Sequence, residues 1–308
     1  MLFPVLLSAV LAAPLGASDV VAYHSSGRYA EVAYEASLVW EEGIYVLDLW
    51  APRGEAGANL TKARQSTETL LEAQMEGAFL QSLADLPVSS LHTIGTMVRE
   101  EPRVLAGLKA LAAAARKTRS HLTPDLEQVR LRYLVPLYGA GGLMGAVAPA
   151  GEPAGFERYL GFVPGAEYSG LLIYARGTYP AWGKAGEERA VRACLLPRIF
   201  DDQMGLVWSA AHVHRDALLE WGPVSYSGDL ELTEAQLGRI GAAPLRVLAR
   251  GVFGTNDTDL IVSGETARRL LGRESAMQAL REGRVVVVLD ASAPPEDLLQ
   301  QESPEAAR

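Results

Sequence analysis

Residues 30–50, AEVAYEASLVWEEGIYVLDLW, contain two runs in which apolar and polar or small residues alternate. The two runs are separated by Glu41-Glu42-Gly43, which is typical of a tight turn. Strict alternation predicts strands that bury one face, so this stretch predicts a β-hairpin. The side chains expected on its buried face are Val32, Tyr34, Ala36, Leu38, Trp40, Tyr45, Leu47 and Leu49.

A long helix is expected directly after the hairpin. Asn59 or Thr61 can cap its start, and apolar residues then recur every three or four positions up to Leu83, before Pro87 ends the helix. The hairpin's apolar face is the nearest surface that could bury this stripe. A shorter helix is expected from Pro102 to about Arg119.

A strand is expected over residues 129–137, where Pro136 favours an edge position or a bulge. Together these elements predict an α+β module over residues 19–139. The Gly- and Pro-rich residues 140–160 read as a linker.

The second half predicts another α+β module over residues 161–290. Ser263 can cap a helix through Leu271, and a second helix is expected over 274–282. Val285–Leu289 has no polar face, which indicates a central strand buried on both sides. Further strands are expected at 168–175, 191–200, 206–208, 245–253 and 259–262. The fold class is therefore α+β, with two modules of mainly antiparallel sheets packed by helices.

The two ends of the chain differ from these modules. Leu2–Gly16 is almost wholly apolar and precedes the small residues Ala17 and Ser18, which is typical of a secretory signal peptide over residues 1–18. No Lys or Arg precedes the run, which departs from that pattern. Residues 291–308 read as a disordered acidic tail. We expect an exported, periplasmic protein.

The composition limits the partners. The formal net charge is −9, so a nucleic-acid partner is not expected. After residue 18 no uninterrupted apolar run is long enough for a transmembrane segment. Cys194 is the only cysteine, so an internal disulfide cannot form. Its apolar neighbours favour a core position. Because it lies far from the N-terminal apolar run, it cannot serve as a lipobox cysteine.

Candidate chemistry is sparse. His212 and His214 would share a strand face and could hold a metal, but nearby ligands are missing. Asp201-Asp202 and the cluster at 256–259 are better explained by Asx turns than by calcium. No Gly-x-Ser-x-Gly sequence occurs. We therefore predict no catalytic residues, no metal and no cofactor. A deep cleft holding two or more of His212, His214, Asp201 and Asp257 would contradict this.

Aromatic residues suggest a binding surface. Tyr174, Tyr179 and Trp182 lie near a Gly- and Pro-rich loop, which could present them to a partner. Packing over a sheet edge is the alternative.

Several segments resemble the LPP20/FlgP-like group of bacterial envelope proteins. They are YSGLLIYARG at 168–177, PRIFDDQMG at 197–205, and residues 244–254 and 284–289. The resemblance implies an envelope or flagellum-associated protein without established catalysis. Many members are lipoproteins, but this chain lacks the cysteine for lipid attachment.

The expected function is a non-enzymatic exported envelope protein with a structural or assembly role. Its partners would be other envelope or flagellar proteins, with self-association and a flagellar link left open. The alternative is a periplasmic protein that binds a small ligand or metal in the cleft between its modules.

Overall fold

The computed structural model describes residues 21–54, 59–139, 141–161 and 166–291. The predicted signal peptide and all but the first residue of the predicted acidic tail lie outside the described residues.

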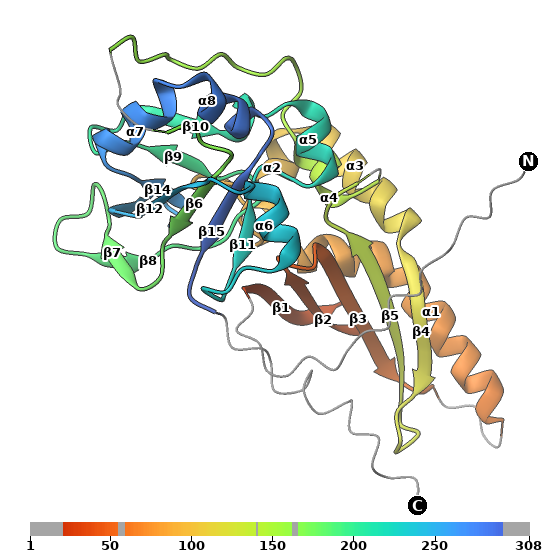
Figure 1. Cartoon of the computed structure of the whole chain (residues 1–308). Coiled ribbons are helices and arrows are strands. Elements are labelled where there is room, and N and C mark those ends of the chain that lie inside the picture. The colour runs from red at the N-terminus through yellow and green to blue at the C-terminus, as the bar shows by residue number, and fades with distance from the viewer. Residues whose placement is uncertain (1–20, 55–58, 140, 162–165, 292–308) are drawn as a thin grey trace, which may run out of the picture.

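The first half forms a five-stranded antiparallel sheet covered on one face by a long helix (Figure 1). The strand order is β1-β2-β3-β5-β4. The strands are β1 (Ala22–Tyr29), β2 (Val32–Val39), β3 (Ile44–Pro52), β4 (Arg116–Leu122) and β5 (Gln128–Pro136). The predicted hairpin is confirmed as β2 and β3, and all eight side chains expected on its inner face are buried.

The long helix α1 (Leu60–Ser82) is also confirmed. Asn59 caps its start, since its side chain accepts a hydrogen bond from the Lys62 amide. Its buried stripe packs on the hairpin as expected, with Tyr45 and Phe79 in edge-to-face contact. The helix ends at Ser82, five residues before Pro87.

Two expectations in this half are wrong, and one helix was not predicted. The shorter helix, α3 (Pro102–Ala114), stops five residues before Arg119, because Arg116–Leu122 forms the edge strand β4. The seven-residue helix α2 (Ile94–Glu100), started by a Thr93 and Thr96 capping box, was not expected. Strand β5 is not at an edge, and the irregularity in its pairing lies in β4. Pro136 is tolerated because it is the last residue of β5, beyond the end of its pairing with β4.

The predicted linker is partly a packed element. Helix α4 (Leu143–Val147) lies within it and buries Leu143, Met144 and Val147 against α3. The glycines on either side therefore connect the modules through a folded segment.

The second half contains a four-stranded sheet in which every pairing is parallel. Its order is β11 (Ser225–Ser227), β15 (Val285–Val288), β6 (Leu171–Tyr174) and β12 (Leu245–Leu248). Strand β15 is central and wholly buried, as predicted. Helix α6 (Glu234–Ile240) covers part of the outer face (Figure 1).

A second four-stranded sheet and a hairpin complete this half. The sheet orders β10 (Leu206–Ser209), β9 (Arg198–Phe200), β14 (Asp259–Ile261) and β13 (Gly251–Phe253). The hairpin pairs β7 (Thr178–Pro180) with β8 (Glu188–Ala190). The helical elements are η1 (Ala210–His212), α5 (Arg215–Glu220), α7 (Gly264–Leu271) and α8 (Glu274–Arg281).

Two predicted strands differ from the observed ones in their bounds. Of residues 191–200 only the last three are a strand. Residues 245–253 split into β12 and β13, because the chain passes from one sheet to the other. The Ala249 amide donates to Tyr174 O beside β12, whereas the Arg250 amide donates to Ile261 O in β14.

The predicted fold class is confirmed: the chain is α+β with two modules. Among the described residues seven of the eleven strand pairs are antiparallel. The four parallel pairs all lie in the second half, which the sequence pattern did not indicate.

The two halves share one hydrophobic core. A single cluster of buried side chains runs from the first sheet into both sheets of the second half. Backbone hydrogen bonds cross between the halves: Leu195 N to Pro87 O (3.1 Å), Leu196 N to Val88 O (2.7 Å) and Asn256 N to Ser90 O (3.0 Å). Such contacts favour one rigid body over two hinged ones.

No helix within the described ranges has the length and apolar character needed to cross a membrane.

Candidate functional site

The two candidate histidines take part in local structure. The Nδ1 atom of buried His212 accepts a hydrogen bond from the Ser209 amide (3.1 Å), and its ring stacks on Phe156. Burial lowers the pKa of His212, so it is neutral at pH 7. His214 is exposed and precedes α5, so the structure does not place the two rings together as a metal pair.

The candidate acids are also separate. Asp201 closes a turn by accepting hydrogen bonds from the Gln203 and Gly205 amides, the Asx turn that was predicted. Asp202 accepts from the Gly264 amide at the start of α7. Asp257 lies 3.9 Å from the Lys184 ammonium. Within the described ranges no three metal-ligating side chains gather in one place.

The three candidate aromatic residues do not form one cluster. The Tyr174 hydroxyl accepts a hydrogen bond from Arg246 on the outer face of the parallel sheet. Tyr179 packs against the large core and donates to Arg176 O. Trp182 begins the turn between β7 and β8, beside an open groove of about 600 Å³ lined by residues 180–188. Of these three aromatic residues, Tyr174 therefore lies on the outer face of the parallel sheet.

An ion pair within the second half also contacts the first half. Asp259 is fully buried and accepts two hydrogen bonds from Arg198, at 2.6 and 3.0 Å. Arg198 also donates to the Ser90 hydroxyl of the first half at 2.6 Å. This arrangement pairs the Asp259 charge in the core through Oδ2, while Oδ1 has no hydrogen-bond partner among the described residues, and the bond from Arg198 to Ser90 connects the modules.

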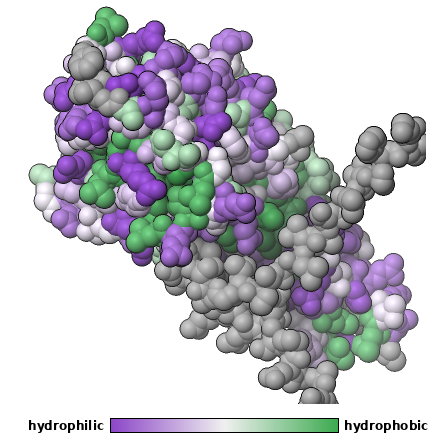
Figure 2. Space-filling model, viewed as in Figure 1, coloured by the Kyte–Doolittle hydropathy of each residue, from purple (hydrophilic) through white to green (hydrophobic). Residues whose placement is uncertain are grey.

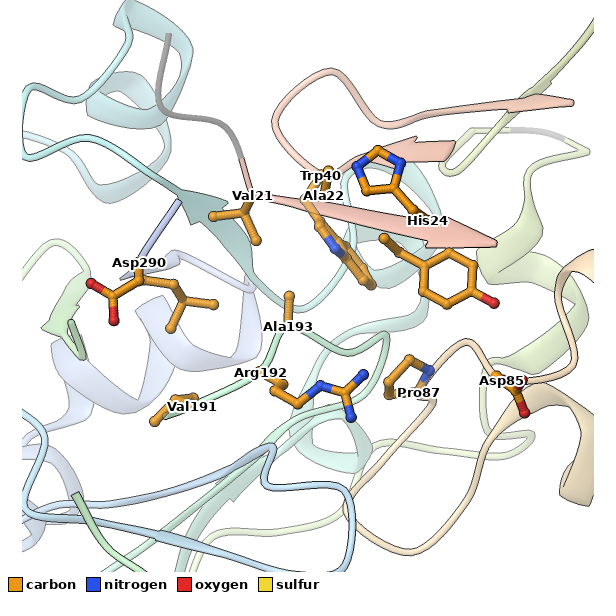
Figure 3. A pocket seen from close by; sticks show the side chains of 12 residues that line it. Val21, Ala22, His24, Trp40, Asp85, Pro87, Val191, Arg192, Ala193 and Asp290 are labelled. Atoms are coloured by element: carbon orange, nitrogen blue, oxygen red, sulfur yellow. The ribbon is translucent and has the colours of Figure 1, made fainter. Parts of the chain in front are cut away.

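The candidate ligand site is a cleft of about 320 Å³ between the two modules. Residues 21–24 and Trp40 line it from the first half, and Asp85 and Pro87 from the loop after α1. The second half contributes residues 191–193 and 289–290 (Figure 3). Its lining combines apolar side chains with the polar side chains of Tyr23, His24, Asp85, Arg192 and Asp290, and the exposed lining is slightly more polar than apolar.

Burial and nearby charges set the electrostatics of this cleft. Burial raises the pKa of Tyr23 to about 12, and its hydroxyl donates to Ser82 O. Arg192 lies within Coulombic range of that hydroxyl and favours its ionised form, whereas Asp85 disfavours it. Burial also lowers the pKa of His24 at the rim. At neutral pH Arg192 is therefore the positive charge of the cleft.

The sequence did not indicate these residues. The cleft is assembled from separate short segments that are far apart in the chain, and none carries a motif. Only the register of β1 and the contact between the modules bring them together.

Comparison with known proteins gives two matches. A family model of the N-terminal domain of Treponema pallidum Tp0624 matches residues 31–142, and a model of its second domain matches residues 170–291. The chain is similar to two domains of Tp0624. They occur here in the same order, one in each module. No curated protein matches the chain. The similarity to Tp0624 gives no indication of a relationship to the LPP20/FlgP-like group.

Proposed function

We propose that the protein is a non-enzymatic, exported envelope protein with a structural or assembly role, acting through its surfaces. The polar side chains most suited to chemistry support this, because they serve the fold. His212 and Asp201 close local turns, and Asp259 is paired with Arg198. A polar group engaged in such contacts stabilises the fold.

The rigid junction supports a scaffold. Because the halves share a core and backbone hydrogen bonds, surfaces on either half keep a fixed relative position. A protein that assembles others benefits from such fixed geometry, since less conformational entropy is lost on binding.

The observation that carries the proposal is the edge strand β12. Its one partner strand among the described residues is β6, so its other edge is available for pairing. Leu248 is 67% exposed and lies in register with Tyr174 on the outer face. Figure 2 shows apolar side chains gathered on this side of the second half.

The chemistry of β12 specifies its occupant. Exposed Arg246 and Arg250 lie on either side of Leu248. Leu230 and Leu237 project from the segment and helix that partly cover the same face. We propose that an extended segment of another envelope protein, with acidic and apolar residues, adds to this edge.

The compartment is also part of the proposal. The apolar N-terminal stretch supports export to the periplasm, and the segments similar to the LPP20/FlgP-like group support an envelope or flagellar partner. Edman sequencing of protein purified from the source cells is expected to start near Ser18.

The direct test is a pull-down from envelope extract with the wild type, Leu248→Glu and Leu160→Glu as baits. Leu160 is 94% exposed and serves as the matched control. Losing the apolar contact and burying a charge costs more than about 1.4 kcal/mol, or tenfold in affinity. We expect an envelope protein to be retained by the wild type and Leu160→Glu and lost with Leu248→Glu. Equal recovery with all three baits would contradict the proposal.

A second candidate function is small-ligand binding in the cleft between the modules. The cleft of about 320 Å³ with charged and aromatic lining favours it.

A further inference from the structure

We propose that the cleft between the modules binds a small organic molecule with one anionic group and an apolar body, and that Arg192 holds the anion. This inference rests on the second candidate function and specifies its ligand class. It does not depend on the role of β12.

Arg192 provides the charge. Its side chain is exposed and forms no ion pair with any described residue, although it lines the cleft. In Figure 3 its guanidinium extends below the Trp40 indole and beside Pro87, inside the cleft. An unpaired guanidinium is suited to bind a carboxylate or phosphate through two parallel hydrogen bonds.

The walls specify an apolar body. Val21, Trp40, Val191 and Leu289 line the same cleft, and each exposes less than a tenth of its surface, so together they offer one small apolar contact area. An apolar ligand group placed against this area removes mainly its own surface from water, because the walls are already nearly buried. The cleft volume is at the low end for ligand sites, which limits the ligand to about the size of one aromatic ring with a substituent.

The acids at the rim limit the ligand's charge. Asp85 lines one end of the cleft and Asp290 the other (Figure 3). Asp290 accepts a hydrogen bond from the Gly177 amide (2.7 Å) and lies 3.5 Å from the Arg176 guanidinium. Asp85 has no such ion pair among the described residues, so a second negative group on the ligand would meet its charge.

The Tyr23 hydroxyl completes the polar contacts. It donates to Ser82 O, so its oxygen keeps a lone pair and cannot also donate to the ligand. With its pKa near 12 it stays neutral and does not repel an anion. Arg192 is therefore the one side chain here whose removal should abolish anion binding.

The test uses isothermal titration calorimetry of the full-length protein with three probes. They are benzoate, its neutral isostere benzamide, and the dianion terephthalate. The variants are Arg192→Gln and the control Arg99→Gln, an exposed arginine of α2 outside the cleft. Melting temperatures check that each variant is folded.

The expected result is saturable benzoate binding by the wild type and Arg99→Gln. Affinity should fall at least tenfold for Arg192→Gln, for benzamide and for terephthalate. Two outcomes would overturn the inference. If benzoate and benzamide bind equally and Arg192→Gln changes nothing, the cleft binds ligands without an anion site, and the second candidate function survives. If the wild type binds neither at millimolar concentration, the inference fails. Quenching of tryptophan fluorescence by a library of neutral fragments then tests the cleft function separately.

Discussion

Arg239 shows how single residues are used in this molecule. It is a nearly fully buried cation whose guanidinium donates to three backbone carbonyls, those of Trp221, Gly222 and Gly283. Burial lowers the pKa of Arg239 to about 10, which still leaves it charged at pH 7. The side chain therefore fastens the turn after α8 to the turn after α5, and its charge serves the fold.

Cys194 gives a prediction at the same scale. Burial raises the pKa of the thiol to about 12, and the Tyr226 hydroxyl donates to Cys194 O. At pH 8 the thiol is therefore almost wholly protonated, whereas the thiolate is the reactive form. We expect negligible labelling by iodoacetamide in the native protein and complete labelling in urea. Rapid labelling of the native protein at pH 8 would show that Cys194 is accessible.

At the scale of elements, the sequence predicts what depends on local periodicity. The hairpin of β2 and β3, helix α1 and the central strand β15 follow from side-chain alternation, three- and four-residue spacing and an unbroken apolar run. The helix start at Ser263 follows from its capping side chain.

Elements that depend on distant partners were missed. Strand β4 has exposed side chains over its first four residues, and it exists because β5 pairs with it. The division between β12 and β13 is set by hydrogen bonds to Tyr174 and Ile261, both more than ten residues away. Parallel pairing of β6 with β12 and β15 is likewise a long-range property. Alternation within one segment contains no information on these partners.

The start of helix α7 gives a prediction at the scale of a single element. The Ser263 hydroxyl accepts a hydrogen bond from the Thr266 amide and satisfies one free donor of the first turn. Ser263→Ala should lower the free energy of unfolding by about 1 kcal/mol, as measured by urea denaturation. Ser263→Asp keeps an acceptor in place and should lose less. A loss with Ser263→Asp equal to that with Ser263→Ala would argue against capping.

At the scale of the whole molecule, the junction between the halves determines both the rigidity and the cleft. The candidate site was not predictable from the sequence, because Tyr23, Trp40 and Arg192 become neighbours only when the two modules pack. The predicted candidates His212, His214 and Asp257 are separated by the same fold.

The shared core predicts a single unfolding transition. Arg198→Met leaves Asp259 buried without its cation and should destabilise the whole chain by about 3–5 kcal/mol. Differential scanning calorimetry should show one peak for the wild type and one peak, at lower temperature, for the variant. Arg99→Met, at an exposed position, should leave the peak unchanged. Two resolved peaks in the wild type would mean that the modules unfold independently.

The central claim is that this protein acts by presenting fixed surfaces to other envelope proteins, with the edge strand β12 as the contact. A photo-cross-linking residue placed at Leu248 or at Leu160 in the source cells tests it most directly. The account predicts an adduct at position 248 with an acidic, apolar segment of another envelope protein, and none at position 160. No adduct at position 248, or the same adducts at both positions, would contradict it.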